Sequence, residues 1–480
     1  MDEMDGGMGM SMPIGDLSPE IVLLVGTVAV LLTALALPRR RQSWAGWAAM
    51  AAVAATTAAT VPMLRGGQTL TFFDTYAADG AAVVAKLVIL GVLALTILLS
   101  LEWMAADARS GEYFAILLFS GLGAVVMAGA ADLMELILGA LLSSATGYVL
   151  AAYHRASPRA TEAGVKYYLL GALTNAGMVY GAALLFGLGA TTSYVGLAGA
   201  LEGKDAIALI AGSVLVVVGI AFKLGAVPAH AWVPDVADGA PLPVSAFLTA
   251  APKVGALVAI GRFVAVLPEA EVGWRVVIAV IAAATMTLGN LAALASDDVR
   301  RLLGWSAISQ TGYGLMAIVA LGRSDLAIPS LLFFTAAYSV ANLAAFGVVT
   351  ELRGRTALAD FAGLGRARPA LAAALALALF SFVGIPPLVG FPAKLALFTA
   401  TVEAGYGWLA VVAVVNTVVS LAYYLRVLAP MYWAPAAAVV PVLGRTAASG
   451  AFIAATLVVA LGLASEVAFS TVEGARLLPW

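Results

Sequence analysis

The sequence predicts an all-α protein that crosses a membrane about fourteen times and contains two inverted five-helix repeats, each with a broken helix. Composition is the first indication, because 62% of the 480 residues are hydrophobic and only 11% are charged, against about a quarter charged in ordinary globular domains. The second is a succession of apolar stretches of about twenty residues, the length that a helix needs to cross the bilayer. The third is a pair of glycine- and proline-rich segments that interrupt two of these stretches.

Short polar or glycine- and proline-marked segments separate the apolar stretches and define the expected helices. The expected spans are residues 20–37, 44–63, 81–101, 113–130, 132–152, 163–189, 205–226, 242–267, 274–295, 302–321, 327–350, 369–402, 406–430 and 449–471. Residues 1–19 are rich in Met, Gly and Asp and lack the basic start of a cleavable signal, so we expect a polar leader there.

The two interruptions indicate how the spans are grouped. The seventh span ends in Gly225 and Pro228, and the twelfth contains GIPPLVGFPAK at residues 384–394. Broken helices at corresponding places in two halves mark the ion path in transporters built from inverted repeats. The expected regions are residues 1–112 with the leader and helices 1–3, 113–267 as the first repeat, 268–430 as the second repeat, and 431–480 with helix 14.

Basic residues orient the chain in the membrane. Arg39, Arg40 and Arg41 follow the first span, so the positive-inside rule places this connection in the cytoplasm. Successive connections lie on alternate sides of the membrane, and this alternation places most of the other arginines of the connections in the cytoplasm as well. We therefore expect a multi-pass protein of the cell (inner) membrane with both termini outside the cytoplasm.

The rarity of cysteine and histidine limits the chemistry of the chain. It has no cysteine and only two histidines, His154 and His230, which excludes thiolate-held iron-sulfur clusters and a series of bis-histidine haems. No glycine-rich phosphate or dinucleotide motif follows a strand-like segment. We expect no cofactor and no metal bound by this chain, and no electron transfer through it.

Five of the six lysines fall inside apolar stretches, whereas most arginines lie in the polar connections. A buried lysine can release its proton, while an arginine in a protein cannot. An ionisable residue within a span is a functional hypothesis by default, because its insertion costs about 2.5–3.5 kcal/mol. Lys223 and Lys394 flank the interruptions and Lys253 lies inside the eighth span, so we expect these three to carry protons.

Other charged residues within the spans have a structural alternative. Lys86 and Lys166 lie near helix ends, where a lysine can extend its amine to water, and the sequence leaves both roles open. Arg262 and Arg426 lie within the eighth and thirteenth spans. Because arginine keeps its charge, we expect structural ion pairs there.

The acidic counterpart of the lysines is predicted on the fifth span. Asp132 and Glu135 are spaced three residues apart and share a helix face. Asp132 is near the helix start, where it can simply interact with the helix dipole, so Glu135 is the better partner for a lysine. If such a carboxylate moves away, the lysine passes its proton to the next one, which amounts to proton translocation without a cofactor.

Several longer stretches carry a resemblance to a known family. They are HAWVPDVADGAPLPVSAFLTAAPK (230–253), EAGVKYYLLGALTNAGMVYG (162–181), GNLAALASDDVRRLLGWSAISQTGY (289–313) and YYLRVLAPMYW (423–433), together with GIPPLVGFPAK. Over roughly residues 110 to 435 the chain resembles the antiporter-like, proton-translocating membrane subunits of respiratory complex I. The form PDV-x-x-GAP, with Lys253 following it, resembles subunit N of NADH-quinone oxidoreductase.

The resemblance implies a role for each buried lysine. Lys223 corresponds to the broken-helix lysine of the first repeat, Lys253 to the connecting lysine of the next helix, and Lys394 to the broken-helix lysine of the second repeat. It also implies that NADH oxidation and quinone reduction take place in partner subunits that hold flavin and iron-sulfur clusters. This chain would then be the non-redox, proton-conducting subunit of a translocase, next to other membrane-arm subunits.

The chain departs from the family pattern at two positions. The fifth-helix motif aligns on DLMELILGALL and puts Leu141 where the family has a glutamate. Glu135 lies six residues earlier, about 9 Å nearer the helix start. Gln310 stands where many subunit N sequences have a histidine, and a glutamine cannot carry a charge. The resemblance also implies a place near the proton path for His230.

Two other classes of protein stay open on the sequence alone. One is a subunit of a multisubunit cation/proton antiporter, driven by an ion gradient, and the other is a cofactor-free arm of a membrane-bound hydrogenase. The GAP after PDV and the YYLRV run favour subunit N. Copurification with flavin- and iron-sulfur-containing subunits would distinguish the first hypothesis from the antiporter.

Overall fold

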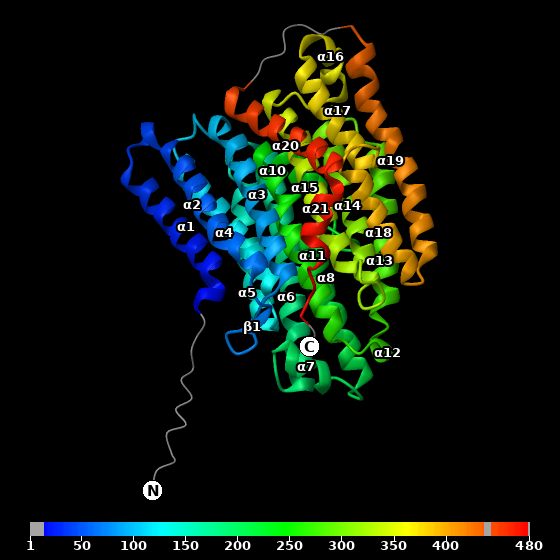
Figure 1. Ribbon diagram of the computed structural model, residues 1–480. Helices are drawn as coiled ribbons and strands as arrows, with labels where there is room; N and C mark the ends of the chain where they lie inside the picture. Colours follow the sequence, from blue (N-terminus) through cyan, green and yellow to red (C-terminus); the bar gives the residue numbers. More distant parts are fainter. Residues whose placement is uncertain (1–13, 436–442, 479–480) are drawn as a thin grey trace.

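The computed structural model describes residues 14–435 and 443–478 and is almost entirely helical (Figure 1). Most of the predicted leader therefore lies outside the described residues. The spans are α1 (Ser18–Ala36), α2 (Trp44–Thr60), α3 (Gly80–Trp103), α4 (Ser110–Gly129), α5 (Leu133–Ala151), α6 (Pro158–Gly189), α8 (Ala206–Leu224), α10 (Leu242–Leu248) with α11 (Ala251–Val266), α13 (Trp274–Leu294), α14 (Val299–Val319), α15 (Ala327–Glu351), α17 (Pro369–Val383) with α18 (Gly390–Glu403), α19 (Gly407–Trp433) and α20 (Arg445–Leu463).

The predicted number of spans is confirmed within this described part of the chain. Twelve helical segments are long and apolar enough to cross a membrane, and α14 and the broken pair of α17 and α18 bring the number to the expected fourteen. The shorter elements are α7 (Tyr194–Ala200), α9 (Trp232–Gly239), α12 (Glu269–Val272), α16 (Leu364–Ala367), α21 (Ser465–Glu473), the 3-10 turns η1 (Ile14–Leu17), η2 (Arg39–Arg41), η3 (Val61–Arg65) and η4 (Leu358–Phe361), and a hairpin of β1 (Thr69–Thr71) and β2 (Tyr76–Ala78).

Both predicted breaks are present. Helix α8 ends before Gly225, which has a φ of 66°, and α17 ends before Gly384, which has a φ of 90°. These left-handed positions suit glycine and end each helix, and the following prolines prevent its direct continuation. The backbone at each break therefore has carbonyl groups that no longer belong to a continuous helical ladder.

Three features differ from the predicted spans. The chain after the first break forms α9, where we expected a plain connection, and the predicted fourteenth span is divided between α20 and α21. The eighth span is interrupted at Thr249 and Ala250, between α10 and α11. The signal for this interruption was Pro252, which lies in the first turn of α11, where proline is tolerated best.

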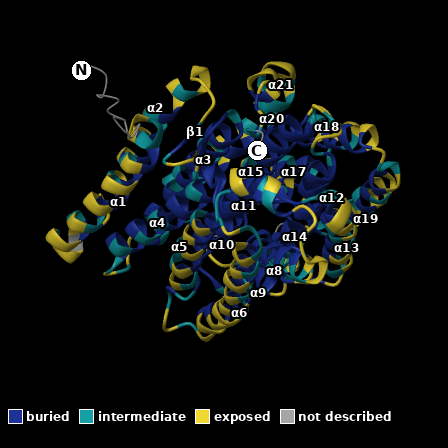
Figure 2. Ribbon diagram, turned by 90° about the horizontal axis from the view of Figure 1, so that it is seen from below, coloured by how far each residue is buried: buried dark blue, intermediate teal, exposed yellow. Residues whose placement is uncertain are grey.

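The most buried helices form the centre of the bundle (Figure 2). An 18-residue window of the Leu242–Val266 segment is 100% buried and that of α15 is 89% buried, whereas only 33% of that of α1 is buried. Large apolar side chains are exposed on α1, α6 and α19, as expected for helices that contact lipid. Small residues permit close helix contacts: a Cβ on Gly289 of α13 would lie 2.6 Å from the backbone nitrogen of Ser309 on α14.

The ends of the described chain agree with an even number of spans. The start of α1 and the C-terminal end of the described chain lie at the same end of the bundle, the lower end in Figure 1. The β1–β2 hairpin and α7 lie at that end as well, and the η2 turn lies at the opposite end. The side of the membrane that each end faces stays a prediction.

Candidate functional site

Helix α14 connects Lys253 with the first break. The Nζ atom of Lys253 lies 2.5 Å from the carbonyl oxygen of Ala307 and 2.9 Å from the Oγ1 atom of Thr311. The Thr311 hydroxyl lies within donating distance of the carbonyl oxygen of Leu224, the last residue of α8, at 2.9 Å, and of the Ala307 carbonyl of its own helix at 3.0 Å. A hydroxyl both accepts and donates, so Thr311 joins the lysine of α11 to the freed backbone end of α8.

Gln310, which precedes Thr311 on α14, contacts the second break. The Nε2 atom of Gln310 donates to the carbonyl oxygen of Phe382 near the end of α17, over 3.3 Å. The Nζ atom of Lys394 donates to the same oxygen over 2.7 Å and lies 4.1 Å from the ring centroid of Tyr313, a cation–π distance. Gln310, Phe382 and Lys394 also line a cavity of about 10 Å³, the lower limit for one water molecule.

Lys223 is buried without a polar partner. It lies in the last turn of α8, directly before Leu224, and only 1% of its surface is exposed. Within the described residues its Nζ atom has no hydrogen-bond partner and no carboxylate acts on it electrostatically. Burial of a lone ammonium ion is costly, and an amine can avoid that cost by losing its proton.

No carboxylate accompanies Lys253 or Lys394 either, among the residues that the structure describes. Their partners are backbone carbonyls, a threonine hydroxyl and aromatic rings, all of them neutral. The three lysines therefore share one kind of environment, which is buried, uncharged among the described residues and adjacent to an interrupted helix.

Glu135 does not accompany these lysines. It lies in the first turn of α5, and the charges near it are those of Asp132, Glu20 and Lys86. Asp132 caps α5 by accepting from the backbone nitrogen of Met134 over 2.6 Å, and its second oxygen accepts from the Thr192 hydroxyl over 2.6 Å. These contacts agree with the alternative role of Asp132, which is to stabilise the start of α5.

At the position where the family has its glutamate, Leu141 is 39% exposed. The polar groups one and two turns further along α5 are neutral. Asn175 of α6 donates to Ser144 over 3.1 Å and to the Tyr148 hydroxyl over 3.3 Å. Among the described residues no carboxylate lies beside Lys223, so the loss of the acidic partner at Leu141 stays a prediction that these contacts favour over substitution by Glu135.

Lys166 belongs to a surface cluster. Its side chain is 46% exposed and forms ion pairs with Glu162 at 2.7 Å and with Asp235 of α9 at 3.0 Å. Asp235 also pairs with Arg301 of α14 at 3.2 Å. The structure thus places Lys166 at the junction of α6, α9 and α14 and not among the buried lysines.

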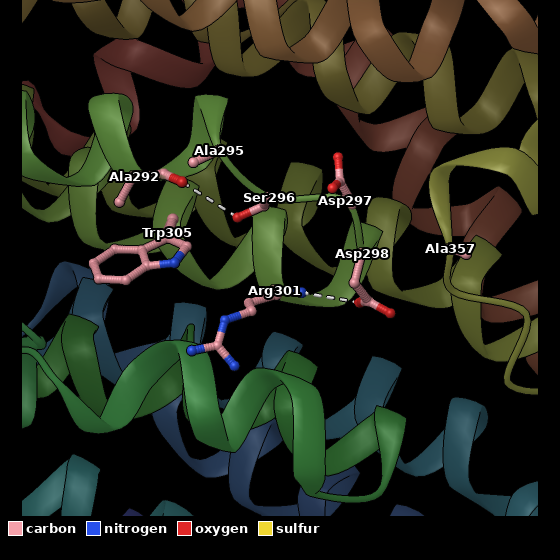
Figure 3. A pocket seen from close by; sticks show the side chains of 8 residues that line it. All are labelled: Ala292, Ala295, Ser296, Asp297, Asp298, Arg301, Trp305 and Ala357. Carbon is pink, nitrogen blue, oxygen red and sulfur yellow. Dashed lines mark hydrogen bonds between the residues drawn. The ribbon is translucent and has the colours of Figure 1, made fainter.

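His230 lies between α8 and α9, next to a pocket that opens at the start of α14. Its Nδ1 atom is buried without a hydrogen-bond partner among the described residues, and its ring lies 6.1 Å from that of Trp305. The pocket has a volume of about 530 Å³. Figure 3 shows Trp305, Arg301, Asp298 and Asp297 along it. Trp305 is therefore the residue between this pocket and His230.

The other histidine is remote from these groups. His154 lies in the connection between α5 and α6, where burial lowers the pKa of its imidazole. The ring is therefore predominantly neutral at pH 7.

Sequence reasoning missed several polar residues that surround the lysines. The Tyr338 hydroxyl donates to the carbonyl oxygen of Thr249 over 2.8 Å, at the break between α10 and α11. Ser306 and Tyr424 share a hydrogen bond of 2.5 Å. Ser306 precedes Gln310 by four residues, so a polar stripe on an otherwise apolar helix was the available signal for α14.

Comparisons with known proteins bear on this arrangement. Residues 130–420 match the family described as "NADH:quinone oxidoreductase/Mrp antiporter, TM". The chain is 42% identical to NADH-quinone oxidoreductase subunit N of Mycobacterium sp. (strain JLS) over 419 residues, which cover 87% of this chain and 89% of that protein. It is 41% identical to subunit N 1 of Streptomyces griseus over 466 residues, 96% of this chain and 98% of that protein.

The chain belongs to the subunit N family of NADH-quinone oxidoreductases. The subunit N fold is also found in a solved chain of respiratory complex I from Thermus thermophilus, with a TM-score of 0.80 at 30% identity and coverage of 94% of this chain and 98% of that one. As a subunit N protein, this chain is an antiporter-like, proton-translocating membrane subunit whose partners are other membrane-arm subunits. These predictions are confirmed.

The subunit N fold extends to more distant assemblies. The chain aligns with a chain of the Mrp complex from Dietzia sp. with a TM-score of 0.85 at 20% identity, covering 96% of this chain and 97% of that one. It aligns with a chain of an archaeal membrane-bound sulfane sulfur reductase with a TM-score of 0.86 at 21% identity, covering 96% of both. These similarities concern the fold alone.

Proposed function

We propose that protons cross this subunit along Lys223, Lys253 and Lys394, with α14 as the helix that joins the two breaks. The observation that carries the proposal is the pair of adjacent residues on α14. Thr311 binds the carbonyl end of α8 and the amine of Lys253, while Gln310 binds the carbonyl that holds Lys394. Two adjacent residues of α14 thus each contact one break, Thr311 the first and Gln310 the second.

The neutral surroundings of the lysines support proton exchange. A buried lysine without a carboxylate partner has no counter-charge that fixes it in the protonated form, so it can give up its proton. Thr311 can accept from Lys253 and donate onward without bearing charge. Gln310 orients the Phe382 carbonyl but carries no proton, so water beside it completes the connection to Lys394.

We propose His230 and the pocket beside Trp305 as the route by which protons reach this row. His230 has an unpartnered ring nitrogen, and the pocket carries Asp297 and Asp298. In this scheme Asp132 and Lys166 stabilise the ends of helices. Glu135 belongs to a separate group of charged residues that includes Glu20 and Lys86. The regions 113–267 and 268–430 act as the two inverted repeats.

The energy for this transfer comes from partner subunits. We propose that the chain acts as a non-redox subunit of a proton-translocating NADH:quinone oxidoreductase, with flavin, iron-sulfur clusters and quinone bound elsewhere in the assembly. The absence of cysteine from the sequence agrees with this division of labour. The basic η2 turn supports an inner-membrane location with both termini outside the cytoplasm.

Purification of the intact assembly through a tag on this chain tests the proposed function. We expect flavin- and iron-sulfur-containing subunits to copurify, and NADH oxidation by quinone to acidify reconstituted vesicles. A multisubunit cation/proton antiporter would instead show proton flux driven by a sodium gradient and no such subunits. A membrane hydrogenase arm would copurify with a hydrogen-oxidising partner, and either result would overturn the proposal.

Thr311→Val tests the role of α14. Valine keeps the shape of the side chain but removes the hydroxyl between Lys253 and Leu224. The change leaves the Lys253 amine and the Leu224 carbonyl with one partner fewer, so we expect the rate of proton translocation to fall, by about tenfold for each 1.4 kcal/mol added to the barrier. Proton translocation is measured as the acidification of vesicles, with the variant and the unaltered assembly compared at equal rates of NADH oxidation.

Thr350→Val is the matched control. Thr350 is equally buried, but its hydroxyl only donates to the carbonyl of Phe346 within α15. We expect normal proton translocation in this variant. Equal effects of the two substitutions would remove Thr311 from the path.

A further inference from the structure

A second buried group of ionisable residues lies outside the lysine row, where α1, α3 and α5 meet the β1–β2 hairpin. The Nζ atom of Lys86 lies 2.7 Å from the Oε1 atom of Glu20, and their side chains are 0% and 9% exposed. The Tyr76 hydroxyl donates to the same Glu20 oxygen over 2.5 Å, and its ring centroid lies 5.1 Å from the Lys86 amine. Glu20 is thus held by two partners through one oxygen.

Two carboxylate oxygens of this group have no partner. The Oε2 atom of Glu20 and the Oε2 atom of Glu135 are both buried without a hydrogen bond among the described residues. Glu135 lies within electrostatic range of Glu20 and Lys86. A buried oxygen of an ionised carboxylate that lacks a donor is costly, and a bound proton removes that cost by neutralising the group.

The charges of this group do not balance. Arg262 of α11 neutralises Asp79, the residue that caps α3, through two hydrogen bonds of 2.7 and 2.6 Å. Asp132 is stabilised by its capping contacts at the start of α5. Lys86 then remains as one positive charge for two carboxylates, Glu20 and Glu135. At least one negative charge is left over among Glu20, Lys86 and Glu135, and the carboxylate of Asp132 adds another nearby.

We propose that Glu20, Lys86 and Glu135 form a second proton-binding site, in which one carboxylate of the pair holds an exchangeable proton. When the proton is bound, one carboxylate becomes a carboxylic acid, and the other stays ionised beside the lysine, so the group is neutral. A proton suits the site better than a metal ion, because no three acidic, histidine or cysteine residues come together as ligands in the part of the chain that the structure describes.

The position of this site indicates a role in proton translocation, and this role rests on the proposed function. Arg262 lies nine residues after Lys253 on α11, which is about 14 Å along the helix, and its pair with Asp79 joins α11 to the start of α3. The site therefore lies at the end of α11 that is remote from Lys253, near the β1–β2 hairpin. It serves as a place where a proton is held at that end of the bundle.

Infrared difference spectroscopy of the purified assembly, exchanged between H2O and D2O, tests the site. We expect the C=O stretching band of a buried carboxylic acid, lost in Glu135→Gln and shifted in Glu20→Gln and in Tyr76→Phe. Proton translocation per NADH oxidised should fall together with loss of the band. Glu162→Gln is the control, because Glu162 is an exposed carboxylate on α6 whose loss should leave the band unchanged.

The outcomes separate this inference from the proposed function. A spectrum that is the same in Glu135→Gln, Glu20→Gln and the unaltered assembly would overturn the site, even if lysine variants stop translocation. A band that is present only when sodium ions are removed would show a cation site and would overturn the bound proton. A band that behaves as expected would support the site even if the lysine variants translocate protons normally.

Discussion

Replacement of Lys223 by alanine is expected to stop proton translocation while the assembly stays intact. The amine is 1% exposed and has no partner in the described residues, so its removal strands no donor or acceptor. Lys223→Met removes the amine but fills the space, which separates loss of the proton carrier from creation of a cavity. We expect vesicle acidification to fall at least about tenfold in both variants.

The control for this prediction is Lys204→Ala. Lys204 is the one lysine of the sequence outside the apolar stretches, lies in an exposed connection before α8, and should be replaceable without effect. Lys223→Arg adds a second comparison, because arginine keeps a positive charge that it cannot release, and we expect it to be as inactive as alanine. Normal acidification in Lys223→Ala or Lys223→Met would exclude this residue from the path.

Replacement of Arg262 by alanine is expected to be the most destabilising single change. Its guanidinium group holds Asp79 through two hydrogen bonds and also donates to the carbonyl of Ala128 over 3.0 Å. Without it, Asp79 is a fully buried carboxylate with no counter-charge, and breaking a buried pair in this way costs about 3–5 kcal/mol. The amount of chain in membranes and the thermal stability of the purified assembly measure the loss.

Arg426→Ala is the matched control, because Arg426 pairs at 2.7 Å with Asp297, whose side chain is 87% exposed. An exposed pair contributes at most about 1 kcal/mol, so this variant should assemble normally. The double variant Arg262→Met with Asp79→Asn removes both charges and should recover much of the stability. Equal stability of Arg262→Ala and the unaltered assembly would contradict the assigned role of the ion pair.

The spans and the breaks could be predicted from the sequence because their causes are local. Apolar runs of helix length and the turn chemistry of Gly225 and Gly384 act within a few residues. The interruption before Lys253 was less visible, because Pro252 is compatible with a continuous first turn as well as with a new helix. The predicted structural pairs of Arg262 and Arg426 are both confirmed.

The sequence alone could not show which residues lie next to the charged side chains. Lys86 meets Glu20 across 66 positions of the chain, and helical periodicity gives no information on which helices become neighbours. Glu135 therefore looked like a partner for any buried lysine, and only the tertiary structure places it near the charges of Lys86 and Glu20. The connection of Gln310 and Thr311 to opposite breaks depends in the same way on where α14 lies.

The adjacency of Gln310 and Thr311 couples the two halves of the bundle mechanically. Consecutive residues of an α-helix point about 100° apart, which is why one side chain contacts α8 and the other contacts α17. A rotation of α14 that brings Thr311 closer to one break carries Gln310 away from the other. Any displacement of α14 therefore changes the contacts at both breaks together, so the two halves of the bundle cannot rearrange independently.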